Sequence, residues 1–459
     1  MALILTGVAP SFADENNSGG GGKNAVVPSA SVDWSDAPTI DGTSGIIMDA
    51  GSGMILYEKN ARERRDPASM TKILTALVVL ETADLDQEIT VTEDADDTGV
   101  NIDLKEGEVL TVEQLLYAMM LYSANDAADA LAIGVGGTVE GFCKMMNERA
   151  ARCGATDTEF ANASGLNTYG DAAHLTTEYD IAVITREAMK NETFRKIVAT
   201  EKYEIPATNM SKARKIKSIN YCLVEDEKTV TVNGVERPYK YEGTTGVKTG
   251  YTEIAGQCFC GTAKRGDTEL IAVTMNSTSR EMRFADVMTL WDYGFSKYYT
   301  YTATEGRRTL EEFRVWQGEK GKVAVGISED MDITLNKGAD SSGITVESSK
   351  NDGMIKAPLK KGDVLGTLTA YNEDGEVIAV SDLVALENVE KGGILSYIGI
   401  ADENILPFIL WLLSIAVLII VIRMLIVRSR RKKKKRKKAR RERNMRRREW
   451  EKEKNPFDR

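Results

Sequence analysis

A serine and a lysine, Ser69 and Lys72, stand three residues apart at the start of an apolar stretch. Residues i and i+3 share one face of a helix, so the Lys72 amine is expected beside the Ser69 hydroxyl. A serine hydroxyl is a poor nucleophile at neutral pH unless a neighbouring base takes its proton. A lysine can be that base where burial and nearby cations lower its pKa. The pair predicts an activated serine, although one such tetrapeptide alone is a weak signal.

Two further motifs follow Ser69 in the chain and can complete this chemistry. In the first, the hydroxyl of Ser123 can relay a proton to a leaving group, and the amide of Asn125 can hold a substrate carbonyl. In the second, Lys248 supplies positive charge, and Gly250 lets a peptide backbone approach closely if the segment is an edge strand. Each motif is common by chance. Ser-x-x-Lys, Ser-x-Asn and Lys-Thr-Gly in this order strongly indicate acyl transfer through a serine.

Hydrophobic periodicity indicates which elements carry these motifs. Residues 71–81 predict a buried helix that begins at the first motif, and residues 112–131 show helical periodicity that is interrupted near Ser123. Short strands are predicted at 46–49, 54–58 and 270–275, and further helices at 138–152, 177–190 and 283–293. Strands at both ends of this region with helices between them predict an α/β (α+β) sandwich rather than a doubly wound βαβ fold.

The chain changes character after about residue 305. Helical periodicity gives way to short segments separated by Gly, Asp and Asn turns, which predicts a small all-β domain over 305–387. A connector, 388–404, then leads to residues 405–422, which carry no charge and whose apolar character continues past Arg423 to 427. A segment of this length can cross the ~30 Å hydrocarbon core of a bilayer, so 405–427 is predicted to be a single transmembrane helix.

The distribution of charge supports this topology. From Arg423 to Arg459 the chain has 20 Lys and Arg against 5 Asp and Glu, whereas the rest has 39 basic and 64 acidic residues. By the positive-inside rule, the basic tail, 428–459, is predicted to be cytoplasmic and the upstream domains extracytoplasmic. The acidic body argues against a nucleic-acid partner, and the membrane span that directly precedes the basic run explains that run.

The amino terminus, the cysteines and the histidine further limit the class of protein. Residues 1–13 end like a secretory signal, and 14–31 are typical of a flexible Gly/Asn/Ser linker. Five cysteines are too few and too odd in number for a disulfide framework, so buried free thiols are expected. A metal site is not expected, because the chain has a single histidine. No cofactor is expected either.

Around these motifs the chain resembles the D-alanyl-D-alanine carboxypeptidases, the low-molecular-mass penicillin-binding proteins or S11 serine peptidases. The resemblance is carried by SGIIMDAGSGMILYEKNARERRDPASMTKILTAL, YSANDAADALA and TTGVKTGYTEIAG, and it covers about residues 32–386. It implies a β-lactamase/transpeptidase-like catalytic domain over 32–304 with a β-rich domain after it.

The resemblance also implies a mechanism. Ser69 would attack the carbonyl of the penultimate D-alanine of a peptidoglycan stem peptide, and Lys72 would take its proton. Ser123 with Lys248 would help to protonate the departing D-alanine. Water would then release the shortened peptide, and β-lactams would acylate the same serine as inhibitors. The backbone N–H groups of Ser69 and Tyr251 match the family's oxyanion hole.

Substrate binding is expected from the other motif residues. Thr249 and Arg283 match the groups that hold the terminal carboxylate of the substrate. The expected substrate-binding residues are Asn125, Lys248, Thr249, Gly250, Tyr251 and Arg283.

Two other functions use similar residues. A serine β-lactamase shares the three motif types, but Ala124 stands where class A enzymes have Asp. The nearby acid Asp171 also lacks the setting of the residue that activates the deacylating water. A non-catalytic cell-wall scaffold would have no need of Ser69, Lys72 and Lys248 together.

Two other polar residues are expected to be structural. His174 is the only histidine and suggests a Ser-His-Asp triad, but it lies in a segment that reads as a loop leading into a helix cap. Asp126, next to Asn125, is expected to pack within or cap a helix rather than act as an acid.

Overall fold

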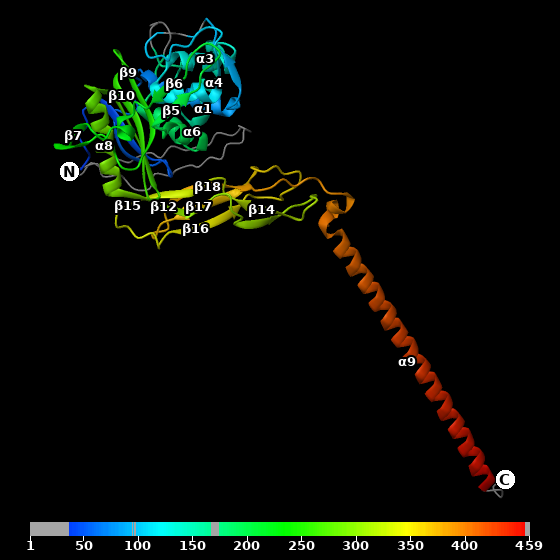
Figure 1. The fold of residues 1–459 in the computed structure, drawn as a ribbon. Helices are drawn as coiled ribbons and strands as arrows, with labels where there is room; N and C mark the ends of the chain where they lie inside the picture. Colours follow the sequence, from blue (N-terminus) through cyan, green and yellow to red (C-terminus); the bar gives the residue numbers. More distant parts are fainter. Residues whose placement is uncertain (1–35, 94, 96–97, 167–173, 455–459) are drawn as a thin grey trace, which may run out of the picture.

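The computed structural model describes residues 36–93, 95, 98–166 and 174–454, with side chains as far as 451. Figure 1 shows an α/β domain, a β domain below it and one long helix that leads away from both. The predicted signal remnant (1–13), the linker (14–31) and Asp171 lie outside the described residues. The mixed α/β class, the later all-β domain and the C-terminal apolar helix are confirmed.

A five-stranded antiparallel sheet, ordered β2-β1-β11-β10-β9, organises the first domain. Its strands are β1 (Ser44–Asp49), β2 (Ile55–Lys59), β9 (Thr244–Thr252), β10 (Gly256–Arg265) and β11 (Thr268–Ser277). β1 pairs with β11, so strands from the two ends of the domain close into one sheet. β9, which carries the third motif, lies at the edge of this sheet, so the condition for close approach of a peptide backbone is met.

Helices cover both faces of this sheet. On one face α8 (Arg280–Lys297) packs with Phe259 and Leu270 in an aromatic-rich core. On the other face lie α1 (Lys72–Thr82), α4 (Val139–Cys153), α5 (Glu178–Ala188) and α6 (Glu192–Val198). These helices share one large core with the sheet, in which residues 73–79 of α1 are almost wholly buried. A helix that is apolar around its whole circumference is stable only in such an interior.

The segment predicted as one interrupted helix forms three pieces. These are α2 (Val112–Tyr117), a π-helical turn (Ala118–Tyr122) and α3 (Asn125–Gly136). Ser123 ends the π turn in the left-handed region, at φ 74°. π-helical turns are rare and are frequently found at functional sites, so the predicted interruption at Ser123 coincides with a feature typical of such sites.

Short elements connect this framework. They are β3 (Glu88–Thr90), β4 (Val109–Thr111), β5 (Lys202–Ile205), β6 (Arg214–Lys217), α7 (Tyr221–Val224), β7 (Thr229–Val232) and β8 (Val235–Pro238). They form three two-stranded sheets, β3–β4 and the hairpins β5–β6 and β7–β8, and one helical turn. Their hydrophobic patterns are too short to stand out in the sequence.

The second domain is built of antiparallel strands. A sheet ordered β13-β14-β18-β17-β16 contains β13 (Glu311–Arg314), β14 (Lys322–Gly326), β16 (Thr345–Lys350), β17 (Val364–Tyr371) and β18 (Val377–Ala385). β12 (Tyr298–Thr304), which follows α8 directly, pairs with β15 (Met331–Asn336). The β12–β15 ribbon therefore links the two domains.

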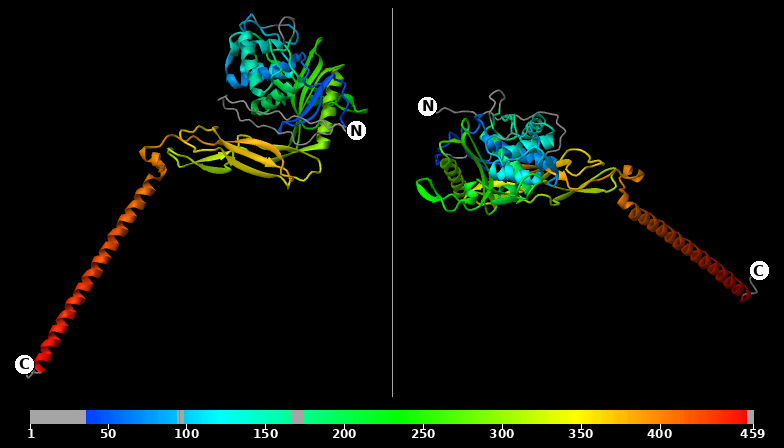
Figure 2. Two further views of the ribbon diagram at one scale, coloured as in Figure 1. Left: turned by 180° about the vertical axis from the view of Figure 1, so that it is seen from behind. Right: turned by 45° about the horizontal axis from the view of Figure 1, so that its top comes forward.

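The long helix α9 (Ile405–Lys454) continues without a break from the apolar segment into the basic tail. It is the one helix in the described residues that is long and apolar enough to cross a membrane, and none of its apolar window is buried against the protein. Figure 2 shows it projecting away from both domains in each view. This exposure suits a helix whose apolar surface is covered by lipid.

Candidate active site

Ser69 lies in a 3-10 turn (Ala68–Thr71) that leads into α1, and Lys72 is the first residue of that helix. The Lys72 ammonium nitrogen Nζ lies 3.1 Å from Ser69 Oγ and 2.8 Å from Asn125 Oδ1. It also donates to the carbonyl oxygen of Ser164. The first two motifs therefore meet at the Lys72 side chain.

Burial sets the protonation of Lys72. The residue is 0% exposed, and this desolvation lowers the pKa of its amine to about 7, although Asp129 and Asp126 act in the opposite direction. A large share of the amine is therefore neutral at neutral pH. A neutral amine 3.1 Å from Ser69 Oγ can accept the hydroxyl proton, which is what a serine nucleophile requires.

The corner that follows the π turn holds the second motif. Ser123 and Asn125 are each 5% exposed. The Asn125 side-chain amide donates to the carbonyl of Thr98 over 2.9 Å, and its backbone N–H donates to the carbonyl of Val100 over 2.7 Å. Asn125 is thus fixed between α1 and the 98–104 loop.

The third motif lies on β9 beside the nucleophile. A Cβ atom on Gly250 would lie 3.2 Å from Ser69 N and 3.1 Å from the Pro67 carbonyl, so glycine lets the strand approach the Ser69 turn. Lys248 and Thr249 are 1% and 4% exposed. Burial, together with the charges of Lys72 and Arg283, holds the pKa of Lys248 well below its usual value.

Tyr251 and Arg283 extend the site past the motif. Tyr251 is 57% exposed at the end of β9. Arg283 comes from α8 and is 5% exposed; its Nη1 donates to the Gly250 carbonyl (3.1 Å) and to Gln257 Oε1 (2.7 Å). Its buried Nε has no hydrogen-bond partner among the described residues. Burial and nearby Arg280 lower its pKa to about 10, so it stays cationic at neutral pH.

The 161–165 loop, for whose residues the sequence predicted no role, completes the surroundings of Ser69. A Cβ atom on Gly165, whose φ is +81°, would lie 1.8 Å from the Ala68 carbonyl oxygen, so only glycine fits there. Asn162 Oδ1 accepts from the N–H groups of Ser164 (3.2 Å) and Gly165 (2.7 Å) and shapes the loop. Ser164 contacts Lys72 through its backbone carbonyl, so the type of side chain at this position does not reveal the contact.

His174 supports this loop. Its Nδ1 accepts from the Ala161 N–H over 3.0 Å, which leaves the proton on Nε2, 2.9 Å from Thr71 Oγ1. Burial lowers its pKa to about 4, so it is neutral at neutral pH. The side chain joins the 161–165 loop to the nucleophile turn, and this contact is structural.

Asp126 also has a structural contact pattern. Its carboxylate accepts from the backbone N–H groups of Ile102 (3.1 Å) and Leu104 (3.0 Å). It thereby holds the 98–104 loop on the first turn of α3.

Among the described residues there is no group of three or more His, Cys, Asp or Glu side chains that could hold a metal ion. The five cysteines are free; Cys153 is half-buried and the other four are buried.

Comparison with known proteins identifies the family. Residues 31–279, more than half of the chain, match the family model described as D-alanyl-D-alanine carboxypeptidase. The chain belongs to the D-alanyl-D-alanine carboxypeptidase family. Residues 299–391 match the C-terminal domain of penicillin-binding protein 5.

Curated relatives and solved structures agree with this assignment. The carboxypeptidase DacF of Bacillus subtilis is 33% identical over 362 residues, which are 77% of this chain and 87% of the relative. DacC of Escherichia coli is 31% identical over 377 residues, 78% of this chain and 86% of the relative. Penicillin-binding protein 5 of Haemophilus influenzae has a TM-score of 0.56 at 26% identity and covers 77% of this chain and 99% of its own. The Streptomyces K15 DD-transpeptidase has a TM-score of 0.50 at 34% identity and covers 56% of this chain and 98% of its own.

The family assignment establishes the reaction class. This carboxypeptidase is a serine hydrolase of cell-wall D-Ala-D-Ala peptides. The second domain, which matches the C-terminal domain of penicillin-binding protein 5, further favours this function over a β-lactamase. The scaffold alternative has no support in the family or in the named relatives.

Proposed function

We propose that Ser69 is the nucleophile of an acyl-enzyme mechanism. The observation that carries this proposal is the position of the buried Lys72 amine, 3.1 Å from Ser69 Oγ, with a pKa near neutrality. Ser69 Oγ attacks the carbonyl carbon of the penultimate D-alanine while its proton passes to Lys72 Nζ. The peptide C–N bond then breaks, and the proton reaches the departing amine with the help of Ser123 and Lys248.

Water completes the cycle by hydrolysing the ester on Ser69 and releasing the shortened peptide. The backbone N–H groups of Ser69 and Tyr251 donate hydrogen bonds to the oxyanion that forms in each half-reaction and stabilise it. The tight approach of Gly250 to Ser69 supports this pairing, because it brings the Tyr251 backbone close to the turn.

The substrate is held on both sides of the scissile bond in this proposal. Asn125 binds the peptide carbonyl, whereas Thr249 and Arg283 bind the terminal carboxylate. A buried, cationic guanidinium next to the strand supports the second role, since it suits an anion more than a neutral group. β-Lactams are proposed to acylate the same serine.

Labelling with a fluorescent penicillin tests the nucleophile. The modified peptide is mapped after digestion, and the label is expected on Ser69 alone. The Ser69→Ala variant should take up no label, whereas Ser164→Ala, which keeps the backbone carbonyl beside Lys72, should still be labelled. Attachment at any other residue would exclude Ser69 as the nucleophile.

We also propose that the enzyme is a single-pass membrane protein. The span 405–427 would hold the domains over 32–304 and 305–387 outside the cell and the tail 428–459 in the cytoplasm. The exposed apolar helix followed by a continuous basic run supports this topology.

A further inference from the structure

An open pocket of about 680 Å³ lies next to the Ser123 corner and has no role in the proposed mechanism. One wall is the loop that contains Asp103 and Lys105, and the other is the segment 210–216, which leads into β6. Tyr122, the residue directly before Ser123, also lines the pocket. The pocket therefore borders the corner that carries Ser123.

The first wall is tied to the catalytic residues themselves. The backbone N–H of Ile102 donates to the Asp126 carboxylate, and the carbonyl of Val100 accepts from the N–H of Asn125. Asn125 in turn contacts Lys72. The position of this wall relative to Ser69 is thus set by hydrogen bonds to the start of α3.

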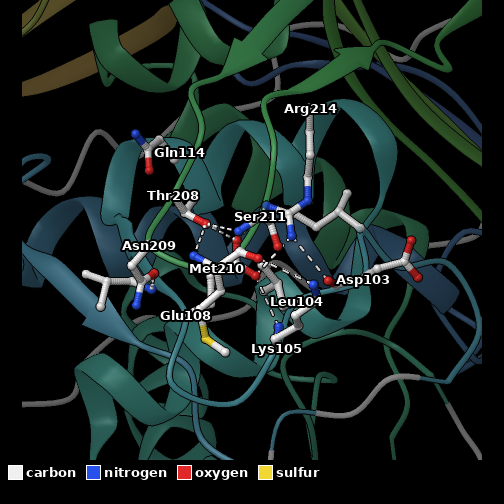
Figure 3. A network of polar contacts seen from close by, with 12 residues as sticks. Asp103, Leu104, Lys105, Glu108, Gln114, Thr208, Asn209, Met210, Ser211 and Arg214 are labelled. Atoms are coloured by element: carbon white, nitrogen blue, oxygen red, sulfur yellow. Dashed lines mark hydrogen bonds and ion pairs between the residues drawn. The ribbon is translucent and has the colours of Figure 1, made fainter.

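The second wall is locked to the first by a buried ion pair, shown in Figure 3. Glu108 is fully buried and accepts from both terminal nitrogens of Arg214 (2.7 and 3.0 Å) and from the Thr208 hydroxyl (2.6 Å). Burial alone would raise the pKa of Glu108, but the Arg214 and Thr208 hydrogen bonds and the Arg214 charge lower it to about 2. Glu108 is therefore charged at neutral pH, and its ion pair with Arg214 joins the two walls.

This pairing leaves a positive surplus in the pocket. The charge of Arg214 is balanced by Glu108, and the remaining charged lining residues are Lys105, Lys212 and Lys215 against Asp103. Neither Lys212 nor Lys215 has an ion pair among the residues that the structure describes. Glu204 stands opposite Lys215 across the β5–β6 hairpin but does not line the pocket.

We propose that this pocket binds a carboxylate of the donor peptide on the amino-terminal side of the scissile bond. The inference rests on the proposed function, in which the terminal carboxylate goes to Arg283. A second anionic group of the same substrate must then belong to the part upstream of the bond that breaks. The pocket makes the enzyme selective for donor peptides that carry a free carboxylate there.

Two matched peptides test this selectivity with the detergent-solubilised full-length protein. Both end in D-Ala-D-Ala; one carries a free upstream carboxylate and the other the corresponding carboxamide. Exposed ion pairs are individually weak, so kcat/KM is expected to favour the carboxylate peptide roughly fivefold. The preference should decrease as salt is added, because about 0.1 M salt screens exposed charges beyond about 10 Å.

Charge reversal locates the site. Lys212→Glu with Lys215→Glu should bring the carboxylate-to-carboxamide ratio to about one or below. The control is Lys217→Glu, an exposed change on the same strand that does not line the pocket, which should keep the wild-type ratio. Thermal unfolding, monitored by circular dichroism, checks that the variants are folded.

Two results would overturn the inference. One is a wild-type ratio of one, and the other is a preference that survives the double reversal in a folded protein. If the proposed function itself were wrong, neither peptide would release D-alanine and penicillin would not label Ser69. That failure is distinct from a loss of selectivity.

Discussion

Three basic side chains occupy one buried space around Ser69. Lys72, Lys248 and Arg283 come from a helix start, an edge strand and a second helix, and each is almost wholly buried. Burial lowers the pKa of all three groups, and the charges of Lys72 and Arg283 lower that of Lys248 further. With a pKa of about 10, Arg283 stays cationic at neutral pH, whereas the Lys72 amine, with a pKa of about 7, is partly neutral there.

The first prediction at this scale concerns pH. Because the base form of Lys72 is the neutral amine and its pKa is about 7, the rate constant for acylation by penicillin should rise with pH through about 7 and then level off. Stopped-flow acylation across this range checks the profile. Lys72→Ala should lose about 10³-fold in rate. A wild-type rate that does not change between about pH 6 and 8 would contradict the role of Lys72 as the base.

The second residue-scale prediction concerns the substrate's end. A fixed guanidinium that pairs with the terminal carboxylate makes charge-assisted contacts worth ~1.5–3 kcal/mol, or roughly 10- to 100-fold in kcat/KM. Arg283→Ala should therefore reduce turnover of a peptide ending in D-Ala-D-Ala much more than turnover of its amidated analogue. Equal losses on the two substrates would show that Arg283 only supports the fold.

At the scale of elements, the site depends on segments that hold one another. The loop with Gly165 packs on the Ser69 turn, the 98–104 loop is held by Asp126, and the β5–β6 hairpin is held by Glu108. None of these contacts lies within one helix or one strand. The loss of one contact should therefore displace a wall of the site while the central sheet remains.

The Glu108–Arg214 pair gives the prediction at this scale. Removing one member of a buried pair leaves an uncompensated charge, so Arg214→Met should lower the free energy of unfolding by about 3 kcal/mol. The double variant Glu108→Gln/Arg214→Met, which buries no charge, should be less affected. Urea unfolding measures both. An Arg214→Met protein as stable as wild type would show that solvent reaches this carboxylate.

The same pair should give stability a pH dependence of known sign. The pKa of Glu108 is lowered on folding from its usual 4.5 to about 2. Its contribution is therefore complete above about pH 4.5 and is lost as the pH falls through about 2. The double variant lacks this component, so the difference from wild type should shrink across that window.

At the scale of the whole molecule, the β domain connects the catalytic domain to the long helix. The buried Asp49 carboxylate of the catalytic sheet accepts from Thr300 on β12 (2.6 Å) and from Thr334 on β15 (2.9 Å). This hydrogen bonding ties the β12–β15 ribbon to the edge of the first domain. We propose that the β domain is a pedestal that separates Ser69 from the start of α9, where the membrane would begin.

The topology prediction belongs to this scale. Some twenty basic residues do not cross a bilayer readily, and anionic lipids of the cytoplasmic leaflet attract them by about 1 kcal/mol each near the surface. Protease added to intact protoplasts should remove the domains upstream of Ala401 and spare an epitope placed after Arg459. Digestion of that epitope would show that the protein has the opposite orientation in the membrane. Release of the protein by alkaline carbonate would show that the helix lies on the surface and does not span.

The sequence by itself determined the chemistry, the class of fold and the apolar helix. The candidate site residues could be proposed from the sequence because each combines a reactive side chain with a short local motif, which is visible without the structure. These residues are Ser69, Lys72, Asn125 and the motif on β9. The interruption at Ser123 was visible for the same reason. Periodicity likewise located α1, α4, α5 and α8 to within a few residues of their observed ends.

Only the tertiary structure decided what surrounds those residues. The Ser164 carbonyl is a backbone group that any residue has, so no pattern distinguishes it. Glu108 and Arg214 stand far apart in the sequence, and either charge alone resembles ordinary exposed surface. The pKa of Lys72 follows from burial by several segments at once. Such properties arise when distant segments meet and exclude water, and a linear pattern cannot state which segments will meet.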